Sequence, residues 1–594
     1  MGFTTRPELL GTFGMVTSTH WLASSTAMAI LELGGNAFDA AVAAGFVLQV
    51  VEPHLNGPGG EVPIIFYSAA QDKVRVLCGQ GVTPAAMDHP TLVSLGLEVV
   101  PGTGLLPAVV PGAFGAWMTL LRDYGQLPLD VVLGYGIDYA ENGYPVVPRM
   151  SASIMAIEDF FKTQWLSSAA EWLVDGHAPR PNSRFANPAI ADTYKRIIAQ
   201  AQQVSDRSEQ CEVARNVFYE GFVAEAVDDY FRHNAVLDTS GRHNKGLLTG
   251  QDMAMWRATY EDSASYHYHG HDVHKTGPWG QGPVFLQQLA LLKGFDLAAM
   301  DPNGPDFIHV VTECSKLAFA DRDVFYGDPD HADIPLAVLL SDEYNTTRRS
   351  LIDMSAASLA FRPGELGDSL HRTDILLRNA GKQQSGGIGQ GEPTFADLPE
   401  LRGDTVHLDV ADRWGNVVSA TPSGGWLQAA PAIPGLGFNI TTRAQMFWME
   451  QGLPSSIGPG RRPRTTLTPT LVMKDGKPFC AFGSPGGDQQ DQWTLQMFLK
   501  HIHHGMNLQE AIDAPTFQTA HLINSFYPRN LSLGKISIES RYPQHTQDVL
   551  RARGHDVTVS GSWSLGRVCA IGASGGFLRG AATPRQMQAY AVGR

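Results

Sequence analysis

The sequence has few cysteines, and their spacing excludes the sites that cysteines most often build. Its 594 residues include five, and no two of them form a C-x-x-C pair. Neither a disulfide framework nor a zinc finger is therefore indicated. We expect all five to be buried, reduced thiols: Cys78, Cys211, Cys314, Cys480 and Cys569.

Long hydrophobic runs are also absent. No apolar stretch approaches the ~20 residues that a transmembrane helix requires. Residues 1–10, MGFTTRPELL, contain neither a lysine-rich start nor the continuous apolar core of a secretory signal. These absences predict a soluble, cytoplasmic protein that does not bind a membrane.

Excess positive charge and cofactor fingerprints are missing as well. The formal net charge is −15 and the basic residues are scattered, so no nucleic-acid partner is predicted. The glycine-rich loop at 57–60 lacks the lysine and the following helix of a phosphate-binding loop. We therefore expect a small-molecule substrate and no cofactor. With 43% hydrophobic residues, the chain can bury a large core, in several domains or in one large two-layer unit.

Regular periodicity is lacking in one long internal segment, residues 362–403. This segment contains QQSGGIGQG at 383–391, which is typical of a mobile linker. A structureless stretch of such length is uncommon inside a compact enzyme. Cleavage of the bond between Asp404 and Thr405 would explain it as the free tail of an N-terminal subunit. A domain linker or a surface lid is the alternative.

Elsewhere the sequence shows helix and strand patterns. Alanine-rich and amphipathic stretches predict helices, and short alternating runs bounded by turn residues predict strands. Residues 111–322 are expected to be mostly helical. Helices are predicted at 22–33, 38–51, 282–294, 306–322 and 492–501, and strands at 62–67, 74–78, 405–410 and 416–421.

Thr405 is the most informative residue, because it stands between the irregular segment and a predicted strand. If the bond before it is cut, its freed α-amine, with an unperturbed pKa of roughly 8, can act as the base for its own hydroxyl. Such a nucleophile needs neither histidine nor metal. The alternative is an ordinary threonine at the entry of a strand.

Two other patterns are tempting but weaker. The run Gly572–Gly576 matches G-x-S-x-G around Ser574, yet a nucleophile elbow needs a helix after the serine, and a polar loop follows here. Four histidines alternate at 267, 269, 271 and 274 and could converge on a metal if they shared one face of a strand. No acidic ligand motif accompanies them, so we favour an exposed strand and expect no metal site.

Several motifs, in the same order along the chain, resemble those of the γ-glutamyltransferases, a family of N-terminal-nucleophile hydrolases. Thr405-Val406-His407, followed by DRWGN at 412–416, is similar to the family's pattern at the nucleophile. The resemblance covers nearly the whole chain. The other matching segments are GGNAFDAA (34–41), VEP with GPGG (51–53 and 57–60), KLAFADR with GDP (316–322 and 327–329), RPRTTLTPT (462–470) and GSPGG (483–487).

The resemblance implies a fold, a maturation step and a set of roles. The fold would be a four-layer αββα sandwich of the α/β (α+β) class. Self-cleavage would give subunits of residues 1–404, with 362–404 as a mobile tail, and 405–594, and would allow a dimer of such heterodimers. Thr405 would be the nucleophile, Ser423 its hydrogen-bonding partner, and the N–H groups of Gly486 and Gly487 the oxyanion donors.

The chain departs from the family where γ-glutamyl groups are recognised. Gln80 stands where the family has an arginine for the donor's α-carboxylate, and Met446 where it has an aspartate for the α-amine. Losing a bidentate cation removes the strongest contribution to carboxylate recognition. Arg443, three residues before Met446, would repel an ammonium group. We therefore predict that the substrate is not a classical γ-glutamyl donor.

The remaining pocket residues suit a different acyl group. Arg443 could bind a carboxylate or a carbonyl, and Thr465 and Thr466 replace the family's serine pair while keeping both hydroxyls. The family's lid residues after the nucleophile are replaced by Gly425 and Trp426. A structural ion pair is the alternative role for Arg443.

Several functions remain open at this point. The main prediction is a hydrolase or acyltransferase that attacks an amide or an activated acyl carbonyl, like family members that act on oxo-acid amides or on β-lactam side chains. The alternative within the family is a carbon–carbon bond hydrolase of alkylproline antibiotic biosynthesis that releases an oxo-acid-derived fragment. The alternative from another class is a homologue that never processes itself and serves as a binding or scaffold protein.

Overall fold

Two seven-stranded antiparallel sheets, stacked face to face, form the centre of the molecule. The computed structural model describes residues 3–381 and 405–594. The first sheet has the order β1 (Leu9–Gly11), β20 (Phe577–Ala582), β19 (Cys569–Ser574), β15 (Lys477–Gly483), β14 (Thr470–Lys474), β11 (His271–Lys275), β10 (Ala264–Tyr268). The second has the order β21 (Tyr590–Gly593), β2 (Gly14–Ser18), β12 (Leu408–Asp412), β13 (Val417–Ala420), β3 (Val62–Ser68), β4 (Lys73–Gly79), β9 (Thr259–Glu261).

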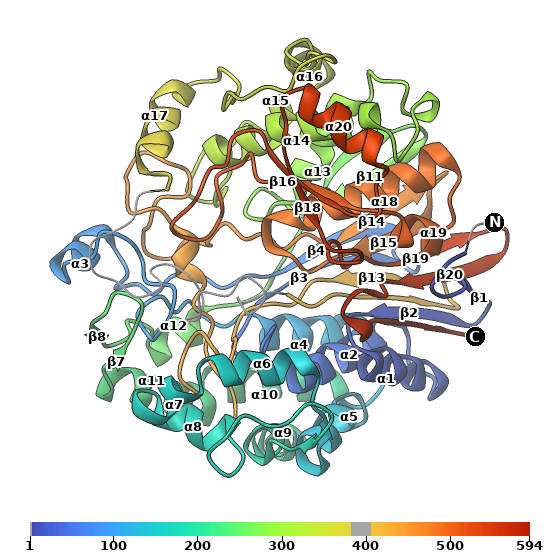
Figure 1. Cartoon of the computed structure of the whole chain (residues 1–594). Coiled ribbons are helices and arrows are strands. Elements are labelled where there is room, and N and C mark those ends of the chain that lie inside the picture. The colour runs from blue at the N-terminus through green and yellow to red at the C-terminus, as the bar shows by residue number, and fades with distance from the viewer. Residues whose placement is uncertain (1–2, 382–404) are drawn as a thin grey trace.

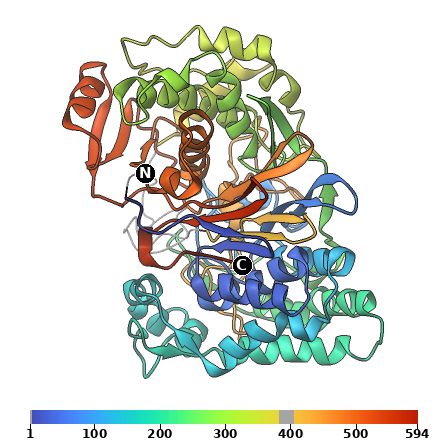
Figure 2. The same cartoon turned by 90° about the vertical axis from the view of Figure 1, so that its right-hand side faces the viewer.

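Helices cover the outer face of each sheet, as Figures 1 and 2 show, and this four-layer αββα arrangement confirms the predicted fold. The layer against the second sheet is built from α1 (Trp21–Glu32), α2 (Ala37–Val51) and α4 (Ala113–Tyr124), backed by α5 (Leu129–Asn142), α9 (Pro188–Ala201) and α10 (Arg207–Tyr219). The layer against the first sheet is built from α13 (Gly282–Leu292), α14 (Pro305–Phe325), α18 (Gln490–His504) and α19 (Leu508–Asp513).

Shorter elements surround these layers. A small sheet contains β16 (Phe517–Thr519), β17 (Lys535–Glu539) and β18 (Asp556–Ser560), and two-stranded pairs join β5 (Tyr144–Pro145) to β6 (Arg184–Phe185) and β7 (Val236–Leu237) to β8 (His243–Asn244). The other helices are α3 (His89–Ser94), α6 (Pro148–Ala156), α7 (Glu158–Thr163), α8 (Leu166–Trp172), α11 (Phe222–His233), α12 (Gly250–Met255), α15 (Leu336–Leu339), α16 (Asp342–Arg349), α17 (Ser369–Asn379) and α20 (Gln544–Ala552).

The strand β12 shows how the sequence builds two adjacent cores. Successive side chains of a strand point to opposite faces of the sheet. Leu408 and Val410 therefore pack in the core under α1 and α2, whereas Ala411 packs between the two sheets with Leu471 and Ile571. Because both faces are covered, all five residues of β12 are buried.

The predicted helices and strands are present, with ends shifted by a few residues, but one segment differs. Within 362–403, where no periodicity was expected, residues 369–379 form α17. This short helix is stabilised because Leu376 is buried in the same core as α14, and Ile375 packs beside it. The predicted mobility of residues 382–404, and Asp404 itself, lie outside the described residues.

The histidine-rich stretch folds as a hairpin rather than as a single strand. His267 belongs to β10 and His271 and His274 to β11, while His269 stands in the turn with φ of 47°. Their ring nitrogens bond to separate neighbours, for example His267 to Asp272 at 2.7 Å. Figure 1 shows this part at the far edge of the first sheet from the chain termini.

Ser574 also lies in a hairpin. It is the last residue of β19, and the strand β20 begins after Gly575 and Gly576, both with positive φ. A helix does not follow, so the geometry of a nucleophile elbow is not met. All five cysteines are buried and free, as expected.

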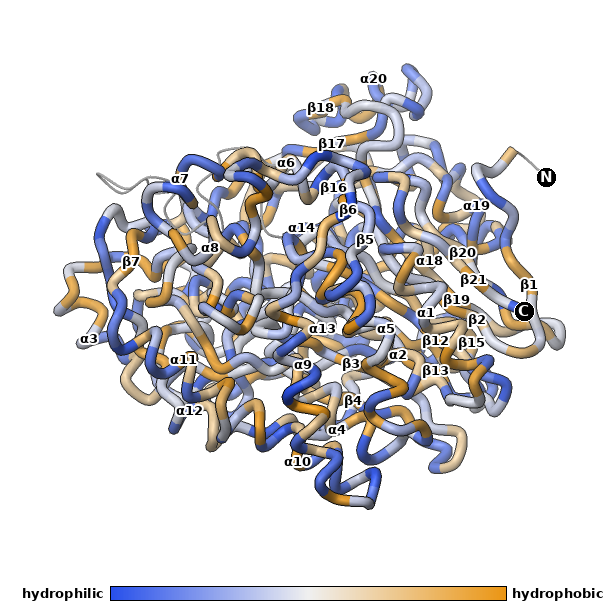
Figure 3. Tube along the Cα trace, turned by 90° about the horizontal axis from the view of Figure 1, so that it is seen from below, coloured by the Kyte–Doolittle hydropathy of each residue, from blue (hydrophilic) through white to orange (hydrophobic). Residues whose placement is uncertain are grey.

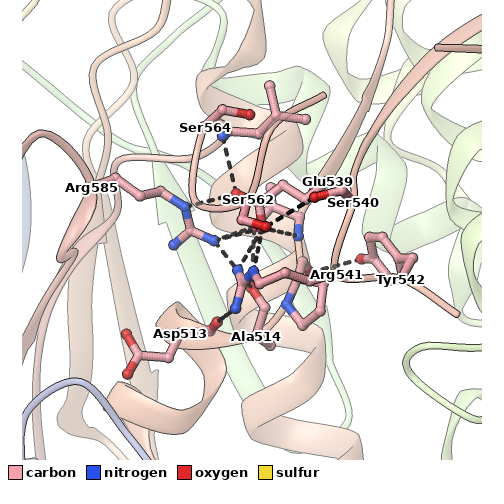
Figure 4. A network of polar contacts seen from close by, with 12 residues as sticks. Asp513, Ala514, Glu539, Ser540, Arg541, Tyr542, Ser562, Ser564 and Arg585 are labelled. Carbon is pink, nitrogen blue, oxygen red and sulfur yellow. Dashed lines mark hydrogen bonds and ion pairs between the residues drawn. The ribbon is translucent and has the colours of Figure 1, made fainter. Parts of the chain in front are cut away.

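A buried carboxylate links the small sheet to the C-terminal region. Figure 4 shows Glu539 between the guanidinium groups of Arg541 and Arg585. Arg585 also donates to the carbonyl of Ile512 at 2.8 Å, and Arg541 to that of Asp513 at 2.6 Å. The network thereby fixes α19, β17 and the last residues of the chain to one another.

The helices that the structure describes include none with the length and apolar character needed to cross a bilayer. In the hydropathy-coloured trace of Figure 3, apolar and polar residues are interspersed along the elements.

Candidate functional site

Thr405 lies buried beside Ser423, where the start of the β12 segment meets the end of the β13 segment. The two residues form an isolated antiparallel bridge, and the Val406 N–H donates to the carbonyl of Pro422 at 3.0 Å. The Thr405 hydroxyl donates to the Ser423 hydroxyl at 3.4 Å. Thr405 is 2% exposed and Ser423 1%. The structure thus brings the two predicted hydroxyls together.

The ring of His407 fixes the strand that follows Thr405. Its two nitrogens lie 3.0 Å from the Thr421 hydroxyl and 2.9 Å from an Asp409 carboxylate oxygen. Asp409 also accepts from Thr17 at 3.0 Å and from Ser419 at 2.7 Å. All these groups are buried, so the hydrogen bonds among them rigidify the region around Thr405.

The glycine loop after β15 lies close to the same strand. A Cβ on Gly483 would lie 2.3 Å from the His407 ring, so the end of β15 packs directly on the start of the β12 segment. Gly486 has φ of 129° and Gly487 has φ of 56°, a region that favours glycine. A side chain on Gly486 would also meet Trp493 at 2.2 Å. The loop that carries the predicted oxyanion donors therefore requires glycine at 486 and favours it at 487.

Asp488, the residue after this loop, is held by a buried ion pair that the sequence did not reveal. Its carboxylate pairs with Arg322 of α14 and accepts from the N–H of Ser525 at 2.8 Å. Burial alone would raise the pKa of Asp488, but the Arg322 and Arg464 guanidinium groups hold it below its ordinary value. Arg322 was visible as part of the KLAFADR motif, but no local signal indicated its partner.

Arg443 is held by a second buried ion pair. Its Nε donates to Glu61 at 2.6 Å, and its Nη2 donates to the Ser423 hydroxyl at 2.9 Å. The guanidinium carbon lies 4.8 Å from the centre of the Trp426 ring. Thr441 donates to the other oxygen of Glu61 at 2.8 Å. Arg443 is therefore one hydroxyl group away from Thr405, and its charge is already paired.

Glu61, which the sequence motifs did not single out, joins this group of buried residues. Burial raises the pKa of its carboxyl group, and the neighbouring Arg443 opposes that shift. Its backbone pairs in both directions with Ser423, at 2.9 and 3.0 Å. A Cβ on Gly60 would lie 2.2 Å from the Ser423 carbonyl oxygen, so the glycines of the 57–60 loop permit this close approach.

The other predicted binding residues occupy different surroundings. Gln80 is buried, and it lines a cavity of about 510 Å³ together with Arg462 and Asp328. The lining of this cavity includes neither Thr405 nor Ser423. Thr465 and Thr466 are buried; the Thr465 N–H donates to the Trp279 carbonyl at 2.9 Å, and its hydroxyl accepts from the Leu467 N–H at 3.3 Å.

In the part of the chain that the structure describes, one trio of side chains has ligand atoms close enough to hold a metal ion: His309, Glu313 and His555. The two imidazoles already bond to each other at 2.8 Å, and Glu313 pairs with Lys316 at 2.5 Å. These contacts occupy one ring nitrogen of His555 and the carboxylate of Glu313, and the buried Nδ1 of His555 has no hydrogen-bond partner among the described residues.

Comparisons with known proteins agree with this geometry. Residues 23–593 match the Gamma-glutamyltranspeptidase family. The glutathione hydrolase-like YwrD proenzyme of Bacillus subtilis (strain 168) is 29% identical, with 97% of this chain and 98% of that protein covered. A solved structure of LmbA2991 has a TM-score of 0.92 and 49% identity, with 100% of each chain covered. A cephalosporin acylase from Bacillus halodurans has a TM-score of 0.81 and 28% identity, with 100% of this chain and 98% of that one covered.

The buried threonine–serine pair, the end of β15 packed on His407 and the match over 23–593 lead to one assignment. The chain belongs to the γ-glutamyltranspeptidase family of N-terminal-nucleophile hydrolases.

Proposed function

We propose that this chain is a proenzyme that cleaves its own bond between Asp404 and Thr405 and then hydrolyses an activated acyl substrate with Thr405. The mature subunits would be residues 1–404 and 405–594. The observation that carries the proposal is the buried contact of the Thr405 and Ser423 hydroxyls, 3.4 Å apart. An ordinary strand-entry threonine has no need of a buried hydroxyl partner that is itself bound by an arginine.

The chemistry follows from the groups around Thr405. The freed α-amine takes the proton of the Thr405 hydroxyl as its oxygen attacks the substrate carbonyl. The N–H groups of Gly486 and Gly487 stabilise the oxyanion, a contribution of about 10²–10³ in rate for one donor. The tetrahedral intermediate then expels the leaving group, which takes the proton from the ammonium group. Water hydrolyses the ester on Thr405 and regenerates the free threonine.

The leading substrate class is an oxo-acid in which a carbon–carbon bond is broken. The leaving group in that case is a stabilised carbanion, which the same ammonium group protonates. The 49% identity to LmbA2991 over the whole of both chains supports a place in the same branch of the family as that protein. The absence of an arginine at Gln80 and of an acidic residue at Met446 also supports a substrate other than a γ-glutamyl donor.

Amide hydrolysis is the second candidate, and the acylase fold match at 28% identity favours it. The two candidates differ only in the leaving group, because Thr405 would form the same acyl ester in both. Product analysis therefore separates them: an amine is released in one case and a new C–H bond forms in the other.

The first experiment is to measure the intact mass and N-terminal sequence of the purified protein beside a Thr405→Ala variant. We expect two fragments, one beginning at Thr405, from the parent chain and a single chain from the variant. A parent chain that stays whole would reject self-cleavage. Incubation of the cleaved protein with oxo-acid and amide panels, followed by mass analysis of the 405–594 fragment, then tests for the acyl ester.

A further inference from the structure

A buried group of charged residues lies behind the glycine loop, and among the described residues two of its three arginines form no ion pair with a carboxylate. The group contains Arg322, Asp323, Arg464, Asp488 and Arg529, and each is at most 7% exposed. Arg322 pairs with both carboxylates, Asp323 at 2.7 Å and Asp488. Both anions are therefore already engaged by a single arginine.

The other two arginines differ in how their N–H groups are satisfied. Arg529 donates to three carbonyl oxygens, those of Ser525, Gln445 and Phe447, at 3.0, 3.2 and 2.8 Å, and it is attracted by the partly exposed Glu450. Arg464 makes one side-chain hydrogen bond, from Nη2 to the Ser525 hydroxyl at 2.9 Å. Among the described residues, its buried Nη1 has no hydrogen-bond partner.

An unpaired N–H on a buried guanidinium is costly. A buried donor without an acceptor costs about 1–3 kcal/mol, and more when the group is charged. Burial and the nearby Arg322 lower the pKa of Arg464 to about 9, against the attraction of Asp323 and Asp488, and Arg464 stays protonated at neutral pH. A bound anion would remove this cost, because carboxylates accept charge-assisted hydrogen bonds from arginine.

The position of Arg464 links it to the proposed chemistry. It directly precedes Thr465 and Thr466, the hydroxyl pair. Its one hydrogen-bond partner, Ser525, also holds Asp488, the residue after Gly487. An anion bound at Nη1 of Arg464 would therefore lie behind the loop that carries the oxyanion donors.

We propose that Arg464 binds a carboxylate group of the substrate, taking over the recognition that the family's lost arginine at Gln80 would provide. This inference rests on the proposed function, because it concerns the same reaction. It defines the substrate class as an acyl compound that carries a free carboxylate. It also gives the two arginines different roles: Arg443 is paired with Glu61 and supports Ser423, whereas Arg464 binds the anion.

The test uses oxalate as a probe and calorimetric titration of the mature protein. The parent protein should bind oxalate, and Arg464→Met should weaken binding at least about tenfold, the effect of losing a hydrogen bond to a charged group. Arg464→Lys should give an intermediate affinity, since lysine keeps the charge but not the planar fork. Arg413→Met, which changes an exposed arginine, is the matched control and should bind oxalate like the parent.

Thermal unfolding without oxalate separates a binding role from a structural one. If Arg464 awaits a ligand, Arg464→Met should have an unchanged or higher Tm, because replacing buried charges by apolar groups is often neutral or stabilising. A strongly lowered Tm in Arg464→Met, equal oxalate binding by Arg464→Met and the parent, or no oxalate binding by the parent would overturn the proposal.

Failure of the proposed function would be recognised separately. N-terminal sequencing of the same samples reports whether Thr405 is released. Oxalate binding that depends on Arg464 in a chain that never cleaves would support the anion site and reject the self-cleaving hydrolase.

Discussion

Arg443 and Glu61 form a buried ion pair in which Nε lies 2.6 Å from Oε1, and the same guanidinium reaches the Ser423 hydroxyl at 2.9 Å. The pair thus stands directly behind the serine that contacts Thr405. From this position we expect Arg443 to act by positioning Ser423.

Replacing Glu61 by glutamine should be strongly destabilising. The change leaves the Arg443 charge buried without its carboxylate, a loss typically of about 3–5 kcal/mol. Urea unfolding measures this loss in the free energy of unfolding. Glu61→Gln is compared with its parent in a Thr405→Ala background, in which self-cleavage does not interfere. The double variant Glu61→Leu/Arg443→Met should recover much of the stability. Equal stability of Glu61→Gln and its parent would contradict the buried pair.

Ser423→Ala should slow self-cleavage more than it lowers stability. The variant removes the hydroxyl that accepts a hydrogen bond from Arg443 and contacts Thr405. A hydrogen bond to a charged group is worth about 1.5–3 kcal/mol, which corresponds to at least a tenfold change in rate. The half-time of precursor disappearance on a denaturing gel gives the rate. Ser423→Thr, which keeps the hydroxyl, should cleave faster than Ser423→Ala; the reverse order would exclude a hydroxyl role.

Gly486→Ala should reduce hydrolysis by about 10²-fold, because the shifted loop misplaces an oxyanion donor. Alanine is strained at φ of 129° and meets Trp493 at 2.2 Å. Gly575→Ala is the matched control: its φ is also positive, at 62°, but its side chain would meet nothing within 4 Å. Circular dichroism first checks that both variants are folded like the parent. Comparison of their kcat values then separates the loss of an oxyanion donor from the effect of backbone strain. Equal losses in both variants would point to backbone strain alone.

Lys500→Met should stabilise the protein at neutral and acidic pH. Burial lowers the pKa of Lys500 from its ordinary value of 10.5 to about 7, and the ammonium group donates to the Pro515 carbonyl at 2.7 Å. Between about pH 7 and pH 10.5 the folded chain binds fewer protons than the unfolded chain. The free energy of unfolding is therefore lowered by its full amount below pH 7, and this destabilisation fades as the pH rises toward 10.

The gain from Lys500→Met should therefore be about 1–4 kcal/mol at pH 6.5 and shrink by pH 9.5. Urea unfolding at the two pH values, with the exposed Lys73→Met as control, measures it. A gain that grows with pH would contradict the sign.

The sequence predicted the main helices and strands well, because those depend on local signals, and the family resemblance gave the four layers. Alternating apolar residues mark the strands around β12, and glycines mark the close approaches to Ser423 and His407. The ion pairs could not be predicted in the same way. Glu61 meets Arg443 across 382 positions of sequence, and Arg322 meets Asp488 across 166, so neither partner carries a local signal. The helix α17 was missed because its stability comes from packing of Leu376 and Ile375, not from a strong pattern.

The order of strands around β12 has a consequence for the life of the mature protein. In the second sheet, β12 and β13 lie between β2 and β3, and β21 lies outside β2. Strands from after Thr405 (β21, β12 and β13) therefore lie on both sides of β2, a strand from before it, within one hydrogen-bonded sheet. After cleavage before Thr405, the same folded structure would consist of two separate chains that both contribute strands to this sheet. The precursor should refold at a rate independent of concentration, whereas the cleaved protein, once unfolded, must refold by a bimolecular encounter of two interleaved fragments.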